Sequence, residues 1–461
     1  MPTQCNAEQL QFSGIERRRV VAAFDGGMVS SDAGALLLQR TDDAIGLLDR
    51  LAGCFIDERR ADSIEHTVRT LIGQRVFGMA LGYEDLNDHE RLRHDPVFGA
   101  LLGKLSAQRR PRCAALAGKS TLNRLELHPL DQSSRYHKIR PDAAAIEGLF
   151  VDLFLDAHRR APAEIILDLD ATDDPLHGHQ EGRFFHGYYD GYCYLPLYIF
   201  SGEHLLVAKL RRANIDGAAG AVEEVERIIT QIRRRWPATR IILRADSGFC
   251  REQLMGWCEQ HAVDYVFGLA RNARLVRAIG AELQAAAAES RATQRPARRF
   301  QELVYRTRNS WTRPRRVVAK AEQTGDKANP RFIVTSLPMQ AWAARALYEE
   351  FYCARGEMEN RIKEAQLDLF ADRLSSATFR ANQLRLWLAS AAYVLMHALR
   401  RVGLAGTALA RACANTIRLR LLKIGAVVTV SVRRVKLAMS EACPNQREFI
   451  AAYHALGAAA R

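Results

Sequence analysis

The stretch Ala163–Asp170, AEIILDLD, is a short apolar run that ends in carboxylates, a pattern typical of a buried β-strand. A second run, Ile241–Asp246 with the sequence IILRAD, closes in the same way. Between them lie a predicted β-hairpin around Gly202 and an amphipathic helix over residues 218–236. A further helix and a third strand follow. A hairpin followed by alternating helices and strands predicts an α/β fold, with a mixed sheet flanked by helices.

Changes of periodicity divide the rest of the chain. Helical patterning precedes the first strand, and three β-type segments after residue 271 interrupt the α/β rhythm before helical patterning returns. We therefore predict an N-terminal arm and helical domain over 1–160, a first part of the core over 161–270, a β-rich insertion domain over 271–344, a second part of the core over 345–403, and a basic C-terminal region over 404–461.

The chain carries a large surplus of positive charge. Its 66 lysines and arginines against 52 acids give a net charge of +14 and an isoelectric point near 9.6. Such a surplus favours a polyanionic partner, nucleic acid before an anionic membrane surface, although a merely basic soluble protein is the simpler alternative. The sequence has no apolar run of eighteen residues and no signal-peptide pattern at its start. Its nine cysteines contain no C-x-x-C pair, so we expect reduced thiols, no membrane partner and a cytoplasmic location.

The two strands that end in carboxylates place Asp170 and Asp246 at matching positions. Carboxylates at strand ends of an α/β sheet point into the crevice where ligands bind. Two acids brought together there repel each other unless a cation lies between them, and Mg²⁺ prefers such oxygen ligands. The alternative is that each aspartate only caps a helix or forms a turn.

A helix predicted around residue 355 carries a polar face. Tyr352, Arg355, Glu359 and Lys363 are spaced three, four and four residues apart, so they lie along one side of the helix. A hydroxyl, a guanidinium, a carboxylate and an ammonium do not suit an apolar core. The alternative is a solvated face with ordinary ion pairs, such as Arg355 with Glu359.

These motifs together resemble those of DDE transposases. Asp170 in LDLDAT, Asp246 in LRADSGF and the pattern Y-x-x-R-G-x-x-E over 352–359 are similar to the DDE transposases of bacterial insertion sequences, and within them to the group with the YREK signature. The segments FDGGMVSSDAGALLL at 24–38 and GYEDLNDHERLRHDPVF at 82–98 resemble one branch of that group. The resemblance spans most of the chain. It implies an RNase H-like catalytic core, with the third acid on a helix that follows a β-rich insertion.

The resemblance also implies a chemistry. Asp170, Asp246 and Glu359 would hold two Mg²⁺ ions, with Mn²⁺ as a possible substitute, while water and then a DNA 3′-hydroxyl attack phosphodiesters. The implied partners are the double-stranded terminal inverted repeats of the element and its target DNA, with a homodimer in the synaptic complex. The parts 1–160 and 404–461 are then candidates for binding DNA ends and for DNA binding or dimerisation. The implied location is the bacterial cytoplasm, at the nucleoid when DNA is bound.

The resemblance assigns further residues on the helix. Tyr352 and Arg355 match the signature residues that contact DNA near the cleaved end. The lysine of the signature, by the usual spacing, would fall on Gln366. Lys363, on the same helix face as Glu359, is therefore the substitute that we predict to contact DNA.

The loop after the first strand contains competing ligands. Asp168 points to the same side of the strand as Asp170. The resemblance, through Ala171 and Thr172, favours Asp170, and Asp168 lies further into the strand. Asp173 and Asp174 are interpreted as turn residues before a proline. The remaining candidates are His177, His179 and His186. With no cysteine nearby they make a poor zinc site, so contacts to phosphate or to the loop are favoured.

Residues 291–316 combine nine arginines with one acid and three aromatic residues. Arginines and aromatic rings suit phosphate contact and base stacking, which predicts DNA binding by Trp311, Arg313, Arg315 and Arg316. In related transposases an insertion-domain tryptophan stabilises a flipped base, a role that the resemblance would give to Trp311. The alternative is that Trp311 packs in a small core.

We therefore predict a Mg²⁺-dependent DDE transposase, an endonuclease and DNA strand transferase that acts on the ends of its own insertion sequence. A catalytically silent DNA-binding protein derived from a transposase is the alternative from another class. A nuclease that cleaves without strand transfer would share the same three acids.

Overall fold

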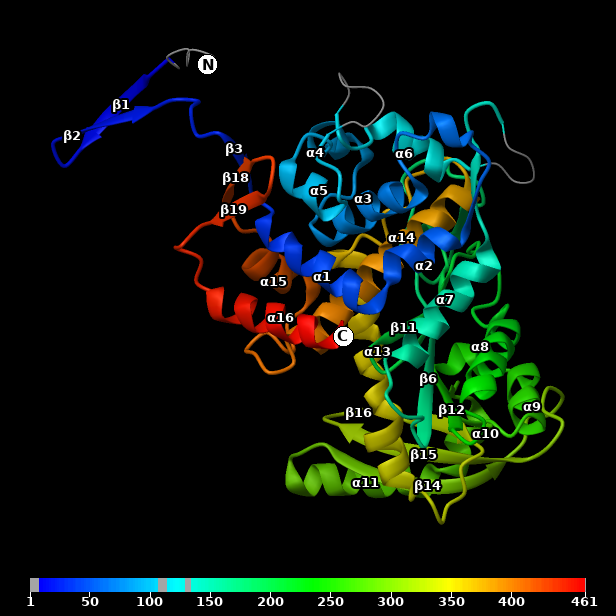
Figure 1. Cartoon of the computed structure of the whole chain (residues 1–461). Coiled ribbons are helices and arrows are strands. Elements are labelled where there is room, and N and C mark those ends of the chain that lie inside the picture. Colours follow the sequence, from blue (N-terminus) through cyan, green and yellow to red (C-terminus); the bar gives the residue numbers. More distant parts are fainter. Residues whose placement is uncertain (1–7, 107–113, 129–133, 461) are drawn as a thin grey trace. The chain divides into compact units, whose positions relative to one another are not determined.

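The computed structural model describes residues 8–106, 114–128 and 134–460. The chain forms two compact units, one of Met1–Arg140 with Ala391–Arg461 and the other of Pro141–Ser390 (Figure 1). The sequence predicts five parts, whereas the C-terminal residues share a unit with the N-terminal ones. The helix α7 (Ala143–Asp156), within the predicted N-terminal part, belongs to the second unit.

The second unit is built on one nine-stranded sheet with the order β11-β10-β6-β12-β13-β17-β15-β14, and β16 pairs with β15. Strands β6, β12 and β13 are parallel, while every other pairing in the sheet is antiparallel. The predicted mixed α/β sheet is thus confirmed. The strands are β6 (Glu164–Ala171), β10 (Leu197–Ser201), β11 (His204–Lys209), β12 (Arg240–Ala245), β13 (Asp264–Leu269), β14 (Ala297–Tyr305), β15 (Arg315–Thr324), β16 (Lys327–Ala328) and β17 (Arg331–Thr335).

Helices cover both faces of this sheet. On one face, alternate residues of the central strands, such as Leu167 and Leu243, pack with helix α8 (Ala221–Arg235) and helix α9 (Glu252–Gln260) in one large core. The apolar residues of α8 recur at three and four positions, which makes that helix amphipathic. Successive strand residues point to opposite faces, so Ile242 packs in a second core on the other side.

The second core is covered by a long helical segment that runs from residue 344 to 368. Its hydrogen-bond pattern changes along its length, through α12 (Ala344–Ala346), the π-helical η5 (Leu347–Tyr352), the 3₁₀ turn η6 (Cys353–Arg355), α13 (Gly356–Lys363) and the π-helical η7 (Glu364–Asp368). Leu347, Tyr348 and Phe351 anchor it on the sheet. Departures from α-helical bonding of this kind are frequent at functional sites.

The predicted insertion over 271–344 continues the central sheet. It contains the expected strands β14, β15 and β17, with helices α10 (Ala273–Ala278) and α11 (Gly280–Thr293). Strand β17 pairs with β13, with Val266 opposite Thr335, so the three strands extend the sheet of the core. Val317 and Val334 join the same apolar core as the central strands, which accounts for this extension.

The first unit is mainly helical, as the periodicity predicts. Strand β3 (Met28–Ser30) pairs with β18 (Ala426–Val430), which joins the two ends of the chain in one small sheet. No helix within the described residues is long and apolar enough to cross a membrane. The other α-helices and strands are β1 (Leu10–Ile15), β2 (Arg18–Ala22), α1 (Leu36–Ile45), α2 (Leu47–Gly53), β4 (Phe55–Asp57), α3 (Val68–Ala80), α4 (His89–Leu92), α5 (Pro96–Leu101), α6 (Lys119–Glu126), β5 (Ile139–Pro141), α15 (Ala414–Ile417), β19 (Val435–Met439) and α16 (Gln446–Ala459). Helix α14 (Phe379–Ala398) contributes residues to both units.

A buried histidine makes the stability of this unit depend on pH. His89 is fully buried, with its ring nitrogens 3.1 Å from Gln74 Nε2 and 3.2 Å from Arg75 Nη1. Both neighbours are donors, so a protonated ring would find no acceptor there. Burial and the charge of Arg75 lower the pKa of His89 to about 3.

We expect this histidine to destabilise the protein in mild acid. Between about pH 6.5 and 3 the unfolded chain binds a proton at His89 that the native state excludes, so stability falls as pH falls through that window. From pH 7 to 5 the loss is about 2 kcal/mol. Denaturant unfolding of wild type and His89→Gln at both pH values measures it: the wild type should lose about 2 kcal/mol more than the variant, and equal losses would contradict the assignment.

Candidate active site

The parallel pairing of β6 and β12 brings their carboxyl ends to one edge of the sheet. Leu169 lies opposite Ala245 in the parallel register, so the next residues, Asp170 and Asp246, lie side by side at that edge. The backbone N–H of Gly248 donates to Asp246 Oδ1 at 2.8 Å, which fixes that side chain at the start of the turn η4 (Ser247–Phe249). The two aspartates predicted from matching strand ends are thus neighbours.

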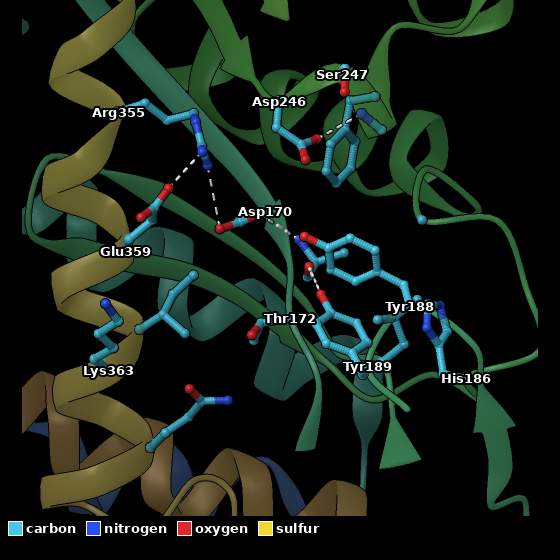
Figure 2. A pocket seen from close by; sticks show the side chains of 17 residues that line it. Asp170, Thr172, His186, Tyr188, Tyr189, Asp246, Ser247, Arg355, Glu359 and Lys363 are labelled. Atoms are coloured by element: carbon cyan, nitrogen blue, oxygen red, sulfur yellow. Dashed lines mark hydrogen bonds and ion pairs between the residues drawn. The ribbon is translucent and has the colours of Figure 1, made fainter. Parts of the chain in front are cut away.

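Glu359 reaches the same place from α13. One helical turn before it, Arg355 lies with Nη2 2.6 Å from Glu359 Oε1 and Nη1 3.4 Å from Asp170 Oδ2 (Figure 2). The ion pair that was the simpler interpretation of this helix face is therefore present, and it extends to the sheet. Arg355 is mostly buried, with a side-chain exposure of 17%. Its guanidinium lies between two of the three predicted acids.

A cavity of about 580 Å³ joins these residues within the second unit. Asp170, Asp246 and Glu359 all line it, with Lys363 on the helix side. Figure 2 shows Arg355, Glu359 and Lys363 on one side of the cavity and His186, Tyr188 and Tyr189 on the other. The structure thus brings together three carboxylates that lie 76 and 113 positions apart in the chain.

The charges in the cavity perturb one another. Burial raises the pKa of Asp170 to about 6; Arg355 opposes that shift, while Asp246 and Glu359 reinforce it. Burial acts to lower the pKa of Arg355, but the carboxylate of Asp170 and the other acids outweigh it and raise that pKa. Burial also raises the pKa of the Tyr352 hydroxyl. Among the described residues that line the cavity, three carboxylates outnumber the two cationic side chains Arg355 and Lys363, and a surplus of negative charge is the condition under which a bound cation stabilises a site.

The donor set fits a hard divalent cation, although the acids are not gathered around one point. Carboxylate oxygens are the ligands that Mg²⁺ prefers, and it uses only one or two of them per ion. Among the residues that the structure describes, no three His, Cys, Asp or Glu side chains are close enough together to hold one metal ion. Arg355 occupies the space between Asp170 and Glu359 instead. A bound ion would require these side chains to shift.

Comparison with known proteins identifies the family of this chain. The family described as "Transposase DDE domain group 1" matches residues 12–460, almost the whole chain. The chain belongs to this family. Among solved structures it is similar to the piggyBac transposase in a cryo-EM structure of its synaptic complex with hairpin DNA, with 12% identity, a TM-score of 0.39, and coverage of 85% of this chain and 80% of that one. No curated protein matches the chain. The predicted DDE transposase family is confirmed.

In this DDE transposase the two aspartates of β6 have different surroundings. Asp168 is 3% exposed and accepts from Arg244 Nε at 2.5 Å and Nη2 at 2.8 Å. Arg244 Nη1 donates to the carbonyl of Phe351 at 2.5 Å, so the pair ties β6, β12 and the long helical segment together. Burial raises the pKa of Asp168 despite that partner. Asp170 lines the cavity, whereas Asp168 is not among its lining residues and is held in the buried pair with Arg244, so Asp170 stays the predicted ligand.

Of the other polar residues in and around this loop, some line the cavity and others are buried behind it in hydrogen bonds. Gln366, where the usual spacing of the signature would place a lysine, donates to Asp174 Oδ1 at 2.8 Å and to the carbonyl of Asp173 at 3.2 Å, and it lines the cavity with Lys363. Asp174 is fully buried, at the start of β7 (Asp174–Pro175). Of the three histidines, His186 is the one that lines the cavity.

The predicted DNA-binding residues of the β-rich segment have contacts of their own. Trp311 is 4% exposed and packs in the main core, with Tyr305 at its edge. Arg315 is 2% exposed and pairs with Glu252 at 2.6 Å and Glu259 at 2.7 Å. Arg316 pairs with Glu302 at 2.6 Å. The side chain of Arg313 is 57% exposed and lies 2.8 Å from Glu259. None of the four is among the described residues that line the cavity, so their DNA contacts remain a prediction.

A glycine that the sequence interpretation missed supports the site. A Cβ on Gly268 of β13 would lie 2.6 Å from the Tyr352 hydroxyl, 2.8 Å from the Ser247 nitrogen and 3.1 Å from the carbonyl carbon of Asp246. Two of these neighbours are backbone atoms, which cannot rotate away. The available signal was a glycine inside an apolar strand, VFGL, a position that often marks the close approach of another backbone.

We expect Gly268→Ala to displace the turn that holds Asp246 and the ring of Tyr352. Overpacking of this kind costs typically about 1–3 kcal/mol, and a displacement of about 1 Å at a reacting group costs roughly 100-fold in rate. Cleavage of DNA ends by Gly268→Ala, normalised to folded protein, measures the effect. Gly256→Ala on α9, where a Cβ would meet no atom closer than 4.0 Å, is the matched control. Equal rates for the two variants would show that the close approach does not matter.

Proposed function

We propose that this chain is a metal-dependent DNA transposase that cuts the ends of its own element and joins their 3′-hydroxyls to target DNA. The observation that carries the proposal is the meeting of Asp170, Asp246 and Glu359 at one cavity in a member of the DDE family. The three acids come from two strand ends and a helix far along the chain.

We assign the ligand role to these three carboxylates. Two bound Mg²⁺ ions, or Mn²⁺ as a substitute, would supply activation of the attacking oxygen and stabilisation of the leaving one. The Gly248 N–H holds the carboxylate of Asp246 in position for that task. The backbone N–H of Ala171 donates to Asp170 Oδ1 at 3.0 Å, which leaves Oδ2 directed toward Arg355.

The cationic side chains of the cavity are suited to phosphate. Arg355 presents a planar, permanently charged group that can exchange a carboxylate for a phosphate oxygen when DNA enters. Lys363, four residues after Glu359, adds a point charge on the same helix face. Tyr352, whose hydroxyl lies against Gly268, is the further DNA contact that the family signature implies, although it is not among the described residues that line the cavity. These residues position the DNA backbone beside the acids.

The fold, partners and origin that we propose for the chain are those implied by the same family. The strand order β11-β10-β6-β12-β13, antiparallel up to β6 and parallel beyond it, supports an RNase H-like core. The charge of +14 supports binding of terminal repeats and target DNA. We further propose a bacterial insertion sequence of the YREK group, action in the cytoplasm and a homodimer that joins the two ends. The acids at the cavity favour an enzyme over a silent DNA-binding descendant.

A joining assay tests this function. Linear DNA that carries the sequences flanking the coding region is incubated with the protein, Mg²⁺ and a supercoiled target plasmid. A transposase gives cut ends with 3′-hydroxyls and products in which those ends are joined to the plasmid. Cut ends without joined products would identify a nuclease instead, and binding without cutting would identify the silent descendant.

A further inference from the structure

A hairpin next to the cavity exposes an unusual number of aromatic rings. Strands β8 (Phe184–His186) and β9 (Gly191–Tyr194) form it, and we call residues 184–194 the aromatic hairpin. Four of its rings are at least one-third exposed, and Tyr188 at its turn is 85% exposed. Contiguous exposed apolar side chains mark interaction sites in folded proteins. The other three exposed rings are Phe184, Phe185 and Tyr192.

The aromatic hairpin is continuous with the candidate active site. Tyr188, Tyr189 and His186 line the same cavity as the three acids. The Tyr189 hydroxyl donates to the carbonyl of Ala171 at 3.4 Å, one residue from Asp170. Figure 2 shows both tyrosines across the cavity from Arg355 and Glu359. A molecule whose phosphate lies at the acids therefore has these rings within reach of its neighbouring groups.

Positive charge accompanies the rings. The guanidinium of Arg183 lies over the Tyr192 ring, 4.6 Å from its centre, and Arg212 packs beside Gly182. Phe185 meets the edge of Tyr192, with ring centres 5.7 Å apart. Exposed rings flanked by arginines match single-stranded nucleic acid, a flexible polyanion with flat bases, better than they match an apolar peptide.

We propose that the aromatic hairpin is a stacking surface for unpaired DNA bases beside the cut phosphate. Every base has a π-face, so such stacking tolerates any sequence, whereas bases within a duplex are already stacked on each other. The tryptophan predicted for such a role, Trp311, is 4% exposed and would have to leave the core to reach a base. Tyr188 is exposed already. This inference rests on the proposed function, because it takes DNA as the substrate of the neighbouring acids.

Fluorescence of a base analogue tests the proposal. The probe is a duplex with the flanking end sequence and a short single-stranded extension that carries 2-aminopurine next to the cut site. The protein binds this duplex in buffer that contains Ca²⁺, which limits cleavage. A matched blunt duplex is the reference. We expect wild-type protein to quench the 2-aminopurine and to bind the extended duplex more tightly than the blunt one.

Two substitutions of the exposed Tyr188 distinguish the contribution of the aromatic ring from those of apolar bulk and of the hydroxyl. Tyr188→Leu removes the π-face and keeps apolar bulk, while Tyr188→Phe keeps the ring and removes the hydroxyl. Tyr188→Leu should lose the quenching and weaken binding of the extended duplex about 10-fold, within the range of one stacking contact. Tyr188→Phe should match wild type, and neither variant should change binding of the blunt duplex.

The outcomes separate this inference from the proposed function. If wild type cuts the ends in Mg²⁺ but Tyr188→Leu quenches and binds as wild type does, the stacking role is wrong and the transposase assignment stands. Equal weakening on both duplexes also overturns stacking, because it indicates a general DNA contact. A smaller mass for DNA-free Tyr188→Leu in light scattering would identify a second copy of the chain as the occupant, against the proposal. If wild type neither binds nor cuts the ends, both assignments fall.

Discussion

Asp170→Asn, Asp246→Asn and Glu359→Gln are each expected to slow cleavage of DNA ends by about 1000-fold or more. Each change removes one negative charge from the cavity that the three side chains share. Loss of a single electrostatic contact to a reacting group already costs about 100- to 1000-fold, and loss of a metal ligand removes the activation of the attacking oxygen as well. A single-turnover assay on end-labelled DNA measures the rates.

The control for these variants is a carboxylate far from the cavity. Asp156 at the end of α7 is about half exposed and pairs with Arg235, so Asp156→Asn should cut at the wild-type rate. The three cavity variants should remain folded, because Asp170 and its neighbours crowd negative charge that their replacement relieves. A near wild-type rate in any one of the three would remove that residue from the proposed centre.

Asp168→Ala is expected to act on stability, with a loss of about 3–5 kcal/mol. It leaves Arg244, whose side chain is 8% exposed, as an uncompensated buried charge between the sheet and the long helical segment. The double variant Asp168→Leu with Arg244→Met removes both charges and should recover most of the loss. Denaturant unfolding monitored by circular dichroism gives the comparison.

This experiment also separates the two aspartates of β6. Asp168→Ala should unfold readily and, where it remains folded, keep measurable cleavage. Asp170→Asn should be stable and inactive. If Asp168→Ala is instead as stable as wild type and fully inactive, Asp168 is the ligand and the geometric distinction between the two side chains is wrong.

The sequence predicts the parts of this site whose signals are local. A run of apolar residues that ends in an acid identifies both β6 and β12, and helical spacing places Arg355 and Glu359 on one face. The choice between Asp168 and Asp170 is different in kind, because both point to the same side of one strand. It depends on Arg244, which lies on the neighbouring strand and pairs with Asp168.

The parts that the sequence does not predict depend on non-local pairing or on exposure. Strands β14, β15 and β17 have the predicted β character, but their membership of the core sheet follows from β13 pairing with β17 across about 65 residues. Gly268 matters because of backbone that lies next to it in space. The rings of residues 184–194 would suit a small core equally well by composition, and only their exposure shows that they are available to a partner.

Binding of Mn²⁺ is the measurement that tests the central claim most directly, because it reports on the ligands and does not require cleavage. Free Mn²⁺ can be counted by electron paramagnetic resonance as the ion is titrated into the protein bound to DNA ends. Two ions should bind per cavity in the wild type and in Asp156→Asn, with one or both lost in Asp170→Asn, Asp246→Asn and Glu359→Gln. Equal Mn²⁺ binding by the wild type and all three cavity variants would contradict the account.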